Sequence, residues 1–237
     1  NPVAAMLKSG HTIDKIFVSS DNKNPRLQLL LKNAREKKIP VQFIPSSALK
    51  RKANSEKHQG IVALLAEHPV LDLDELLHKI RLQKDSPILT MLDGIEDPHN
   101  FGAIIRSAEA AGLSGMIIQQ RHSAPLSSVV AKASAGAISH FPIARVGNLA
   151  QAVDRLKQEG FWIVGSDERS DINYWELSFT APTAVIVGNE GRGIRRLLKE
   201  KSDYLVRIPM YGKTESLNAS VAAALLFYEI RRQRETL

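Results

Sequence analysis

Five short apolar runs, interspersed with stretches of helical character, constrain most strongly what this 237-residue chain can fold into. Each run is mainly apolar and does not alternate regularly with polar residues, which is typical of a strand buried on both faces of a parallel sheet. Strands that alternate with helices in this way predict an α/β domain whose parallel sheet is covered by helices. The runs are residues 88–92, 115–119, 161–165, 184–188 and 204–208, and helices are expected at 98–111, 127–137, 148–159, 193–200 and 217–234.

The residues that precede this sheet predict a second, smaller α/β module. Short apolar segments alternate with one helical stretch, as in a compact α/β sandwich. Residues 69–85 indicate a linker that carries one short amphipathic helix. The chain is therefore expected to hold one domain at 1–68 and another at 86–237. The expected elements of the smaller module are strands at 15–20, 41–44 and 60–66 and a helix at 27–37.

The positive charge of the chain is concentrated in the smaller module. Residues 1–68 hold 12 Lys and Arg against 5 Asp and Glu, whereas residues 69–237 hold 20 of each kind. The whole net charge of +7 therefore lies in the first module. A lysine-rich solvated surface is one interpretation. A basic module beside a neutral one also suits the delivery of a polyanion to a catalytic domain, which makes RNA the expected partner.

Composition excludes several classes of site. The chain has no cysteine, which rules out disulfides, cysteine-based zinc sites and a cysteine nucleophile. Its seven histidines show no metal-ligand spacing, so no metal is expected. No apolar run approaches the roughly 18 residues that span a bilayer, so no membrane partner is expected. A cytoplasmic location is the interpretation that fits these features.

The first of three motifs is DGIEDPHNFGAIIRSAEAAG, residues 93–112. It leaves a predicted strand, passes an acidic Asp-Pro turn and enters a helix. Asn100 lies at the start of this helix, and Arg106 falls outside its core-facing stripe. Open α/β sheets bind ligands just past the carboxyl ends of their strands, although a helix cap and a surface arginine would also explain these two residues. The stripe that is expected to face the core comprises Phe101, Ile104, Ile105 and Ala108.

The second motif, VIVGNEGRGI at residues 185–194, is a strand that runs into a glycine-rich turn. Three glycines within six residues bracket Glu190 and allow the backbone to approach a ligand closely. Their order is neither the G-x-G-x-x-G of a dinucleotide fold nor that of a phosphate-binding loop. By itself such a turn is often only a tight connection.

The third motif is RIPMYGKTESLNASVAAALLFYE, residues 207–229. A strand ends in Ile-Pro, a polar loop follows, and Ser216-Leu217-Asn218 is expected to open the last helix. Ser216 by itself would be explained as the residue that caps this helix. The stripe that is expected to be buried comprises Leu217, Val221, Leu225 and Tyr228.

Taken together, the three motifs, in this order and at these separations, resemble the SpoU/TrmH branch of the SPOUT superfamily, which comprises RNA 2′-O-ribose methyltransferases. The resemblance covers about residues 86–237, and three linked motifs are far more specific than one. The basic segment before them, including His58-Gln59-Gly60-Ile61-Val62-Ala63, is similar to the ribosomal-protein-like RNA-binding domain of the subgroup that acts on large-subunit rRNA. A departure from the family pattern is Phe101, where leucine is commoner.

The resemblance implies a parallel sheet whose carboxyl-terminal part is tied in a deep trefoil knot. It also implies S-adenosylmethionine as the cofactor, bound in a bent shape among the loops of the knot. Gly188, Ile208 and Leu217 are the foremost expected cofactor contacts, through backbone groups and apolar packing around the adenine. The other expected contacts are Asn189, Gly191, Met210 and Ser216.

The chemical roles implied by the resemblance fall on Asn100, Arg106, Glu190, Ser216 and Asn218. Because the ribose oxygen must lie in line with the methyl group, positioning should supply much of the rate. The family often gives Arg106 the role of base, although a guanidinium holds its proton firmly. The alternative is a bidentate grip on the adjacent phosphate, which stabilises the forming alkoxide and lets the phosphate share the proton. Glu190, Asn100 and Asn218 would orient Arg106 and the amino acid end of the cofactor.

Two other functions remain open at this point. A non-enzymatic RNA-binding or ribosome-assembly protein would keep the fold without the activity, but the set of polar residues expected for catalysis is intact. An ordinary nucleotide-binding α/β enzyme would carry phosphate-binding fingerprints that the sequence lacks. Among RNAs, the domain arrangement favours large-subunit rRNA, with tRNA second.

A homodimer through residues 86–237 is also expected, with the active sites near the interface. The resemblance implies it, because domains of this family pair symmetrically beside the knot. The last helix is in addition apolar on more than one side, and a wide apolar surface needs a second cover. A helix buried entirely within its own subunit is the alternative. The residues that broaden the stripe are Ala222, Ala223, Leu226, Phe227 and Ile230.

Overall fold

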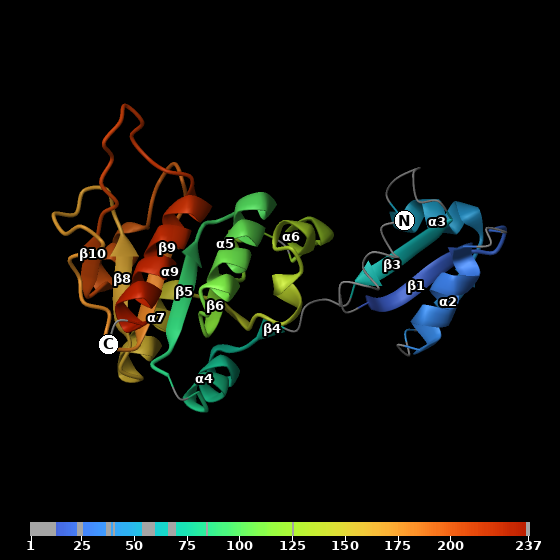
Figure 1. Cartoon of the computed structure of the whole chain (residues 1–237), viewed down its shortest axis with the longest axis horizontal. Coiled ribbons are helices and arrows are strands. Elements are labelled where there is room, and N and C mark those ends of the chain that lie inside the picture. The colour runs from blue at the N-terminus through green and yellow to red at the C-terminus, as the bar shows by residue number, and fades with distance from the viewer. Residues whose placement is uncertain are drawn as a thin grey trace. The chain divides into compact units, whose positions relative to one another are not determined.

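The chain divides into two compact units, Asn1–Pro69 and Val70–Leu237 (Figure 1). The structure of both units is a computed structural model. The residues that it describes are 13–22, 26–36, 39, 41–53, 60–65, 70–83, 85–124 and 126–235.

The first unit is a three-stranded sheet with helices packed against it. The strand order is β2-β1-β3, with β1 and β2 parallel and β1 and β3 antiparallel. Ile16, Val18 and Ile61 pack with α2, whereas Phe17 packs with Leu49 on α3. The elements are β1 (Ile13–Ser19), α2 (Arg26–Glu36), β2 (Val41–Ile44), α3 (Ser46–Ala53) and β3 (Ile61–Leu65).

These elements confirm the α/β character that the sequence predicts for this unit. The helix α3 was not among the expected elements, because it offers only one fully buried anchor, Leu49. Part of the segment that carried the resemblance to an RNA-binding domain, residues 54–59 with His58 and Gln59, lies outside the described residues.

The second unit is built on a seven-stranded sheet in which every neighbouring pair of strands is parallel. Its order is β10-β8-β9-β5-β6-β7-β4. The strands are β4 (Val70–Leu71), β5 (Ile88–Asp93), β6 (Gly115–Gln119), β7 (Ile143–Val146), β8 (Trp162–Ser166), β9 (Thr183–Gly188) and β10 (Tyr204–Val206). The helices are α4 (Leu73–Arg81), α5 (Pro98–Ala110), α6 (Ser128–Ala133), the short 3₁₀ helix η1 (Ala137–Ser139), α7 (Leu149–Gln158), α8 (Arg196–Lys201) and α9 (Ala219–Glu235).

Helices cover both faces of this sheet, as the apolar runs predict. One core joins alternate residues of β5, such as Leu89 and Met91, to the apolar faces of α4, α7 and α8. On the other face α5 and α9 pack against each other, and α6 packs against α5 (Figure 1). Every residue of β5 is buried, including Thr90 and Asp93, which explains why its sequence does not alternate.

Two expectations about the chain before and within this sheet need correction. The expected linker at 69–85 holds β4, which pairs with β7, and α4, whose apolar face enters the core. The helix that the sequence predicts there is present, but it belongs to the compact second unit. Strand β7 was also missing from the expected elements, because four residues interrupted by the exposed Arg145 make a weak pattern.

The last helix presents the opposite face to that predicted. Val221, Leu225 and Tyr228 were expected in the core, but they are 48%, 37% and 52% exposed. The helix begins at Ala219, so Leu217 precedes it. The side-chain oxygen of Asn218, and not that of the expected Ser216, accepts a hydrogen bond from the backbone nitrogen of Ser220 in the first turn. Both apolar stripes have helical spacing, so spacing could not decide which of them meets the sheet. The residues that face inward are Ala219, Ala223, Leu226, Phe227 and Ile230.

Because all strands of the seven-stranded sheet are parallel, their carboxyl ends lie at one edge of this sheet, where open α/β sheets bind ligands. The connections that leave this edge include residues 94–97 after β5, 167–182 after β8, 189–195 after β9 and 207–218 after β10. The trefoil knot implied by the family resemblance stays a prediction. Among the residues that the structure describes, no helix combines the length and apolar character that a bilayer crossing requires.

Candidate active site

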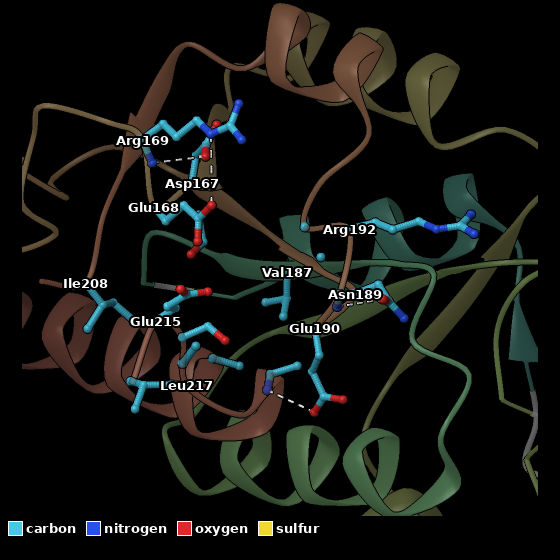
Figure 2. A pocket seen from close by; sticks show the side chains of 18 of the residues that line it. Asp167, Glu168, Arg169, Val187, Asn189, Glu190, Arg192, Ile208, Glu215 and Leu217 are labelled. Carbon is cyan, nitrogen blue, oxygen red and sulfur yellow. Dashed lines mark hydrogen bonds and ion pairs between the residues drawn. The ribbon is translucent and has the colours of Figure 1, made fainter. Parts of the chain in front are cut away.

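A cavity of about 350 Å³ opens at the carboxyl ends of β8, β9 and β10 (Figure 2). Its walls come from the three loops that follow these strands and from the first turns of α9. One side is apolar and includes Val187, Ile208 and Leu217, whereas the loop after β8 supplies charged groups such as Asp167 and Glu168. A cavity of this size with separate apolar and polar walls fits a small amphipathic ligand.

All seven residues that the sequence predicts as cofactor contacts line this cavity. The structure thus brings together two segments that are about twenty residues apart in the sequence. Their role in binding stays a prediction. The seven residues are Gly188, Asn189, Gly191, Ile208, Met210, Ser216 and Leu217.

The glycine-rich turn after β9 folds back on itself at Gly188. A Cβ atom at Gly188 would lie 2.3 Å from the carbonyl carbon of Gly193 and 2.4 Å from the backbone nitrogen of Ile194. Asn189 holds the turn closed, because its carbonyl accepts a bond from the Gly193 N–H (2.7 Å) and its side-chain oxygen accepts one from Gly191 (2.9 Å). Only glycine at position 188 lets the backbone pass so closely.

Three residues predicted for catalysis form one hydrogen-bonded cluster. Glu190 Oε1 accepts from the Nδ2 atoms of Asn100 and Asn218, both at 2.7 Å, and from the backbone nitrogen of Ala219 at 3.3 Å. Asn218 Nδ2 also lies 2.9 Å from Asn100 Oδ1. Glu190 therefore ties the start of α5 and the start of α9 to the glycine-rich turn. Because Glu190 also lines the cavity, the cluster and the cavity form one site.

The other two residues predicted for catalysis lie outside this cluster. Ser216 lines the cavity but forms no hydrogen bond with the cluster members, and its catalytic role stays a prediction. Arg106 is exposed on α5, does not line the cavity, and makes no hydrogen bond or ion pair with another residue of the described segments. A single copy of the chain therefore leaves the Arg106 guanidinium available to a partner or a substrate.

The sequence analysis missed the loop after β8, which supplies Asp167, Glu168 and Arg169 to the cavity. Asp167 pairs with Lys199 of α8 at 2.8 Å. Burial acts to raise the pKa of Asp167, but the Lys199 ammonium and the Arg169 N–H hold this pKa below its usual range. The signal that could have found this loop is its place after a predicted strand of a parallel sheet. Among the described segments, no three His, Asp or Glu side chains gather closely enough to hold a metal ion.

Two family models match this chain. The model described as the SpoU rRNA Methylase family matches residues 87–228. The model described as RNA 2′-O ribose methyltransferase substrate binding matches residues 1–71. Together they account for both compact units.

Known proteins agree with these matches. A protein of Staphylococcus haemolyticus, named for the TrmH family of tRNA/rRNA methyltransferases, is 42% identical over 98% of this chain and 93% of its own length. The SpoU methyltransferase AviRb of Streptomyces viridochromogenes, solved in complex with AdoMet, aligns with a TM-score of 0.75 and 26% identity over 100% of this chain and 88% of its own. The TrmH/SpoU tRNA modifying enzyme of A. aeolicus aligns with a TM-score of 0.58 and 30% identity over 69% of this chain and 84% of its own.

We predict that Gly188→Ala destabilises the second unit, whereas Gly191→Ala does not. The added methyl group at position 188 would overlap backbone atoms of the same turn, and overpacking typically costs about 1–3 kcal/mol. At position 191 the nearest atom is Asn189 Oδ1 at 3.6 Å, an ordinary contact. Urea unfolding of both variants measures the difference. Equal stability of the two variants would contradict the close approach of the backbone at Gly188.

We further predict that Lys199→Gln raises the pKa of Asp167, because burial is then opposed only by the backbone N–H and the charge of Arg169. A carboxyl with a lowered folded pKa stabilises the fold above its usual value near 3.8 and loses this contribution as the pH falls through the folded pKa. As the pH falls, the Lys199→Gln variant should lose this stabilisation at a higher pH than the wild type does. Carboxyl NMR titration measures the shift. Lys201→Gln is the control, because Lys201 pairs with Asp154; an Asp167 titration that is the same in both variants would refute the ion pair.

Proposed function

Because the chain belongs to the SpoU family of RNA methyltransferases, we propose that it transfers the methyl group of S-adenosylmethionine to a ribose 2′-hydroxyl of large-subunit rRNA. The observation that carries this proposal is the junction at Glu190, which joins the cavity to the cluster of Asn100 and Asn218. A cofactor pocket and a set of polar groups that can position a substrate meet there at one residue.

Two matches favour the ribose hydroxyl and rRNA as the acceptor. The model over residues 1–71 is described by its 2′-O ribose specificity, and the model over residues 87–228 is described as an rRNA methylase. The A. aeolicus tRNA modifying enzyme, in addition, covers only 69% of this chain. A tRNA acceptor is the second candidate, because the staphylococcal relative is named for both RNAs.

The residues of the cavity fit S-adenosylmethionine. The narrow turn at Gly188 and the apolar side chains of Ile208 and Leu217 suit a flat adenosyl group, and the charged groups after β8 suit an amino acid end. S-adenosylmethionine supplies an activated methyl group on sulfur when it is bound. AviRb, solved with AdoMet, supports the same cofactor for this chain.

The cluster around Glu190 has the geometry of a positioning device. Three donors converge on Oε1, so this carboxylate oxygen is fixed, and Oε2 forms no hydrogen bond within the described segments. Oε2 can therefore accept a bond from a bound ammonium or hydroxyl group. Fixed groups raise the rate because the reacting atoms are held together without further loss of entropy.

Arg106 is the group that we assign to the reacting ribose and its phosphate. A guanidinium binds a phosphate through two parallel N–H bonds and stabilises the negative charge that forms on the hydroxyl oxygen. The phosphate that Arg106 holds then receives the proton of the 2′-hydroxyl. Because Arg106 of the same chain does not line the cavity, the partner subunit's Arg106 would complete the site in a homodimer with active sites near its interface.

The exposed stripe of α9 supports that homodimer. Val221, Leu225 and Tyr228, with Tyr174 from the loop after β8, line an apolar groove of about 380 Å³. A second copy of the chain, related by a two-fold axis, would cover the groove with the same stripe of its own α9. The first unit, with its surplus of positive charge, would meanwhile supply RNA affinity.

We predict that the protein forms 2′-O-methylnucleosides in unmodified large-subunit rRNA, and that Arg106→Ala lowers kcat at least about 100-fold. Affinity for S-adenosylmethionine should stay nearly unchanged, because Arg106 does not line the cavity. Mass spectrometry of digested RNA measures the first effect and calorimetry the second.

Arg106→Lys is the matched variant, since it keeps the charge but loses the planar pair of donors. It should recover only part of the rate. Near-normal turnover by the alanine variant would remove Arg106 from the mechanism. Methylation of a base in place of a ribose would refute the proposed acceptor, and modification of tRNA alone would favour the second candidate.

We predict that the protein sediments as a dimer and that Leu225→Glu converts it to a monomer with lower activity. The substitution places a charge in the exposed stripe without disturbing the inward face of α9. Leu197→Glu is the control, because Leu197 is equally a surface leucine (53% exposed) but lies on α8. A wild-type protein that is monomeric and fully active at micromolar concentration would contradict the dimer.

A further inference from the structure

A second cavity lies against the glycine-rich turn. It measures about 460 Å³ and is bounded by the ends of β5 and β9 and by the loop after β6. Asn189, Arg192 and Gly193 line both cavities, so the turn is a wall that they share. The cavity is lined by two arginines, Arg192 and Arg195, and by the imidazole of His122. No step of the proposed methyl transfer uses them.

A buried carboxylate fixes one of these cations. Asp93, with a side chain only 2% exposed, accepts from the backbone nitrogen of Arg195 at 2.8 Å and from its Nε at 2.6 Å. Arg195 Nη2 donates to Gln119 at 2.8 Å. The Arg195 side chain nevertheless remains 52% exposed, and its Nη1 has no hydrogen bond within the described segments. Arg195 is therefore held rigidly with a donor left for a ligand.

Arg192 differs from Arg195 in this respect. It makes no hydrogen bond or ion pair with any other described residue. Figure 2 shows its side chain extending away from Asp167, Glu215 and Leu217, the labelled residues of the first cavity. An unpaired guanidinium thus lies in the same cavity as the fixed guanidinium of Arg195.

The carboxylates of this cavity are already engaged. Asp93 is occupied by Arg195, and Glu96 lies 3.2 Å from His122 Nδ1. His122 is one of two non-glycine residues with positive φ in the described segments, at 59°, so its loop is held in a conformation that is rare for such residues. Within the described segments, neither of these carboxylates forms an ion pair with Arg192.

We propose that this second cavity binds a phosphodiester group of the RNA, next to the nucleotide that is methylated. The inference rests on the proposed function, because it takes RNA as the substrate. Arginine is the side chain best suited to the planar arrangement of phosphate oxygens, and contacts to phosphates set the register of a nucleic acid on a protein. The turn that carries Glu190 also carries Arg192, so a phosphate held here would place the neighbouring ribose relative to Glu190.

Two variants test the inference, and a third variant serves as the control. Arg192→Gln removes the unpaired guanidinium. The double variant Asp93→Asn/Arg195→Gln removes the fixed one together with its carboxylate, so that no buried charge is left alone. Arg196→Gln is the control, because Arg196 is the next residue, is 92% exposed, pairs with Glu200 and lines neither cavity.

The measurements are RNA affinity as a function of salt, KM for RNA, and affinity for S-adenosylmethionine, with an unmodified large-subunit rRNA transcript as the probe. Each test variant should raise KM for RNA about tenfold, the usual effect of a lost charged hydrogen bond. The slope of log affinity against log salt should fall by about one phosphate contact. Arg192→Gln should leave the affinity for S-adenosylmethionine unchanged, because the Arg192 side chain extends away from the first cavity (Figure 2). Arg196→Gln should match the wild type in all three measurements.

Three outcomes would decide against the inference or against its premise. Test variants that match Arg196→Gln in KM and in salt slope would overturn the phosphate site. A loss of S-adenosylmethionine affinity that equals the loss in RNA affinity would mean that the two arginines serve the cofactor cavity or the fold, which also overturns it. A wild-type protein that binds RNA without methylating it would refute the proposed function, while the salt slopes would still decide on the phosphate site.

Discussion

The parallel pairing of β5 with β9 is the constraint on which the site depends. The two central strands end side by side, with Asp93 opposite Gly188 in the last register position. Beyond that position Gly188 lets the backbone turn back, while the Asp93 carboxylate holds Arg195 where the turn ends. One pair of residues therefore fixes both ends of the glycine-rich turn. The two cavities on the turn exist because it is pinned in this way.

Glu190 converts this local geometry into a link between distant parts of the sequence. Its Oε1 atom accepts hydrogen bonds from Asn100, 90 residues earlier, and from Asn218, 28 residues later. Three donors meet at one carboxylate oxygen of the exposed Glu190, so each partner restrains the positions of the others. The three motifs that the sequence presents as separate signals are thus parts of one hydrogen-bonded structure.

The sequence alone predicts the positions that depend on strand ends. Gly188 and Ile208 follow apolar runs, and a parallel sheet collects such positions at one edge, so the expected cofactor residues do line one cavity. It does not predict pairings between remote side chains, such as Asp93 with Arg195 or Asp167 with Lys199. No local pattern marks either partner of such a pair.

The sequence also does not predict the orientation of α9 or the start of the second unit, for a related reason. The last helix carries two apolar stripes, and only the shape of the sheet beneath selects Phe227 over Tyr228 for the core. Likewise, two residues of β4 are too few to predict a strand, and they are recognised only by their pairing with β7. In both cases a partner that is distant in the sequence supplies the missing information.

The distribution of charge separates two ways of holding RNA. The first 68 residues carry the whole net charge of +7, which can attract a polyanion from a distance but cannot fix one phosphate at one place. The second unit has equal numbers of acidic and basic residues, so its field gives no general attraction. Any grip on RNA there must come from single guanidinium groups whose position the fold determines. Asp93 meets this need with one buried carboxylate, because it orients Arg195 without using all of its donors. With the phosphate site that we propose, the neutral second unit would set the register of an RNA that the basic first unit attracts.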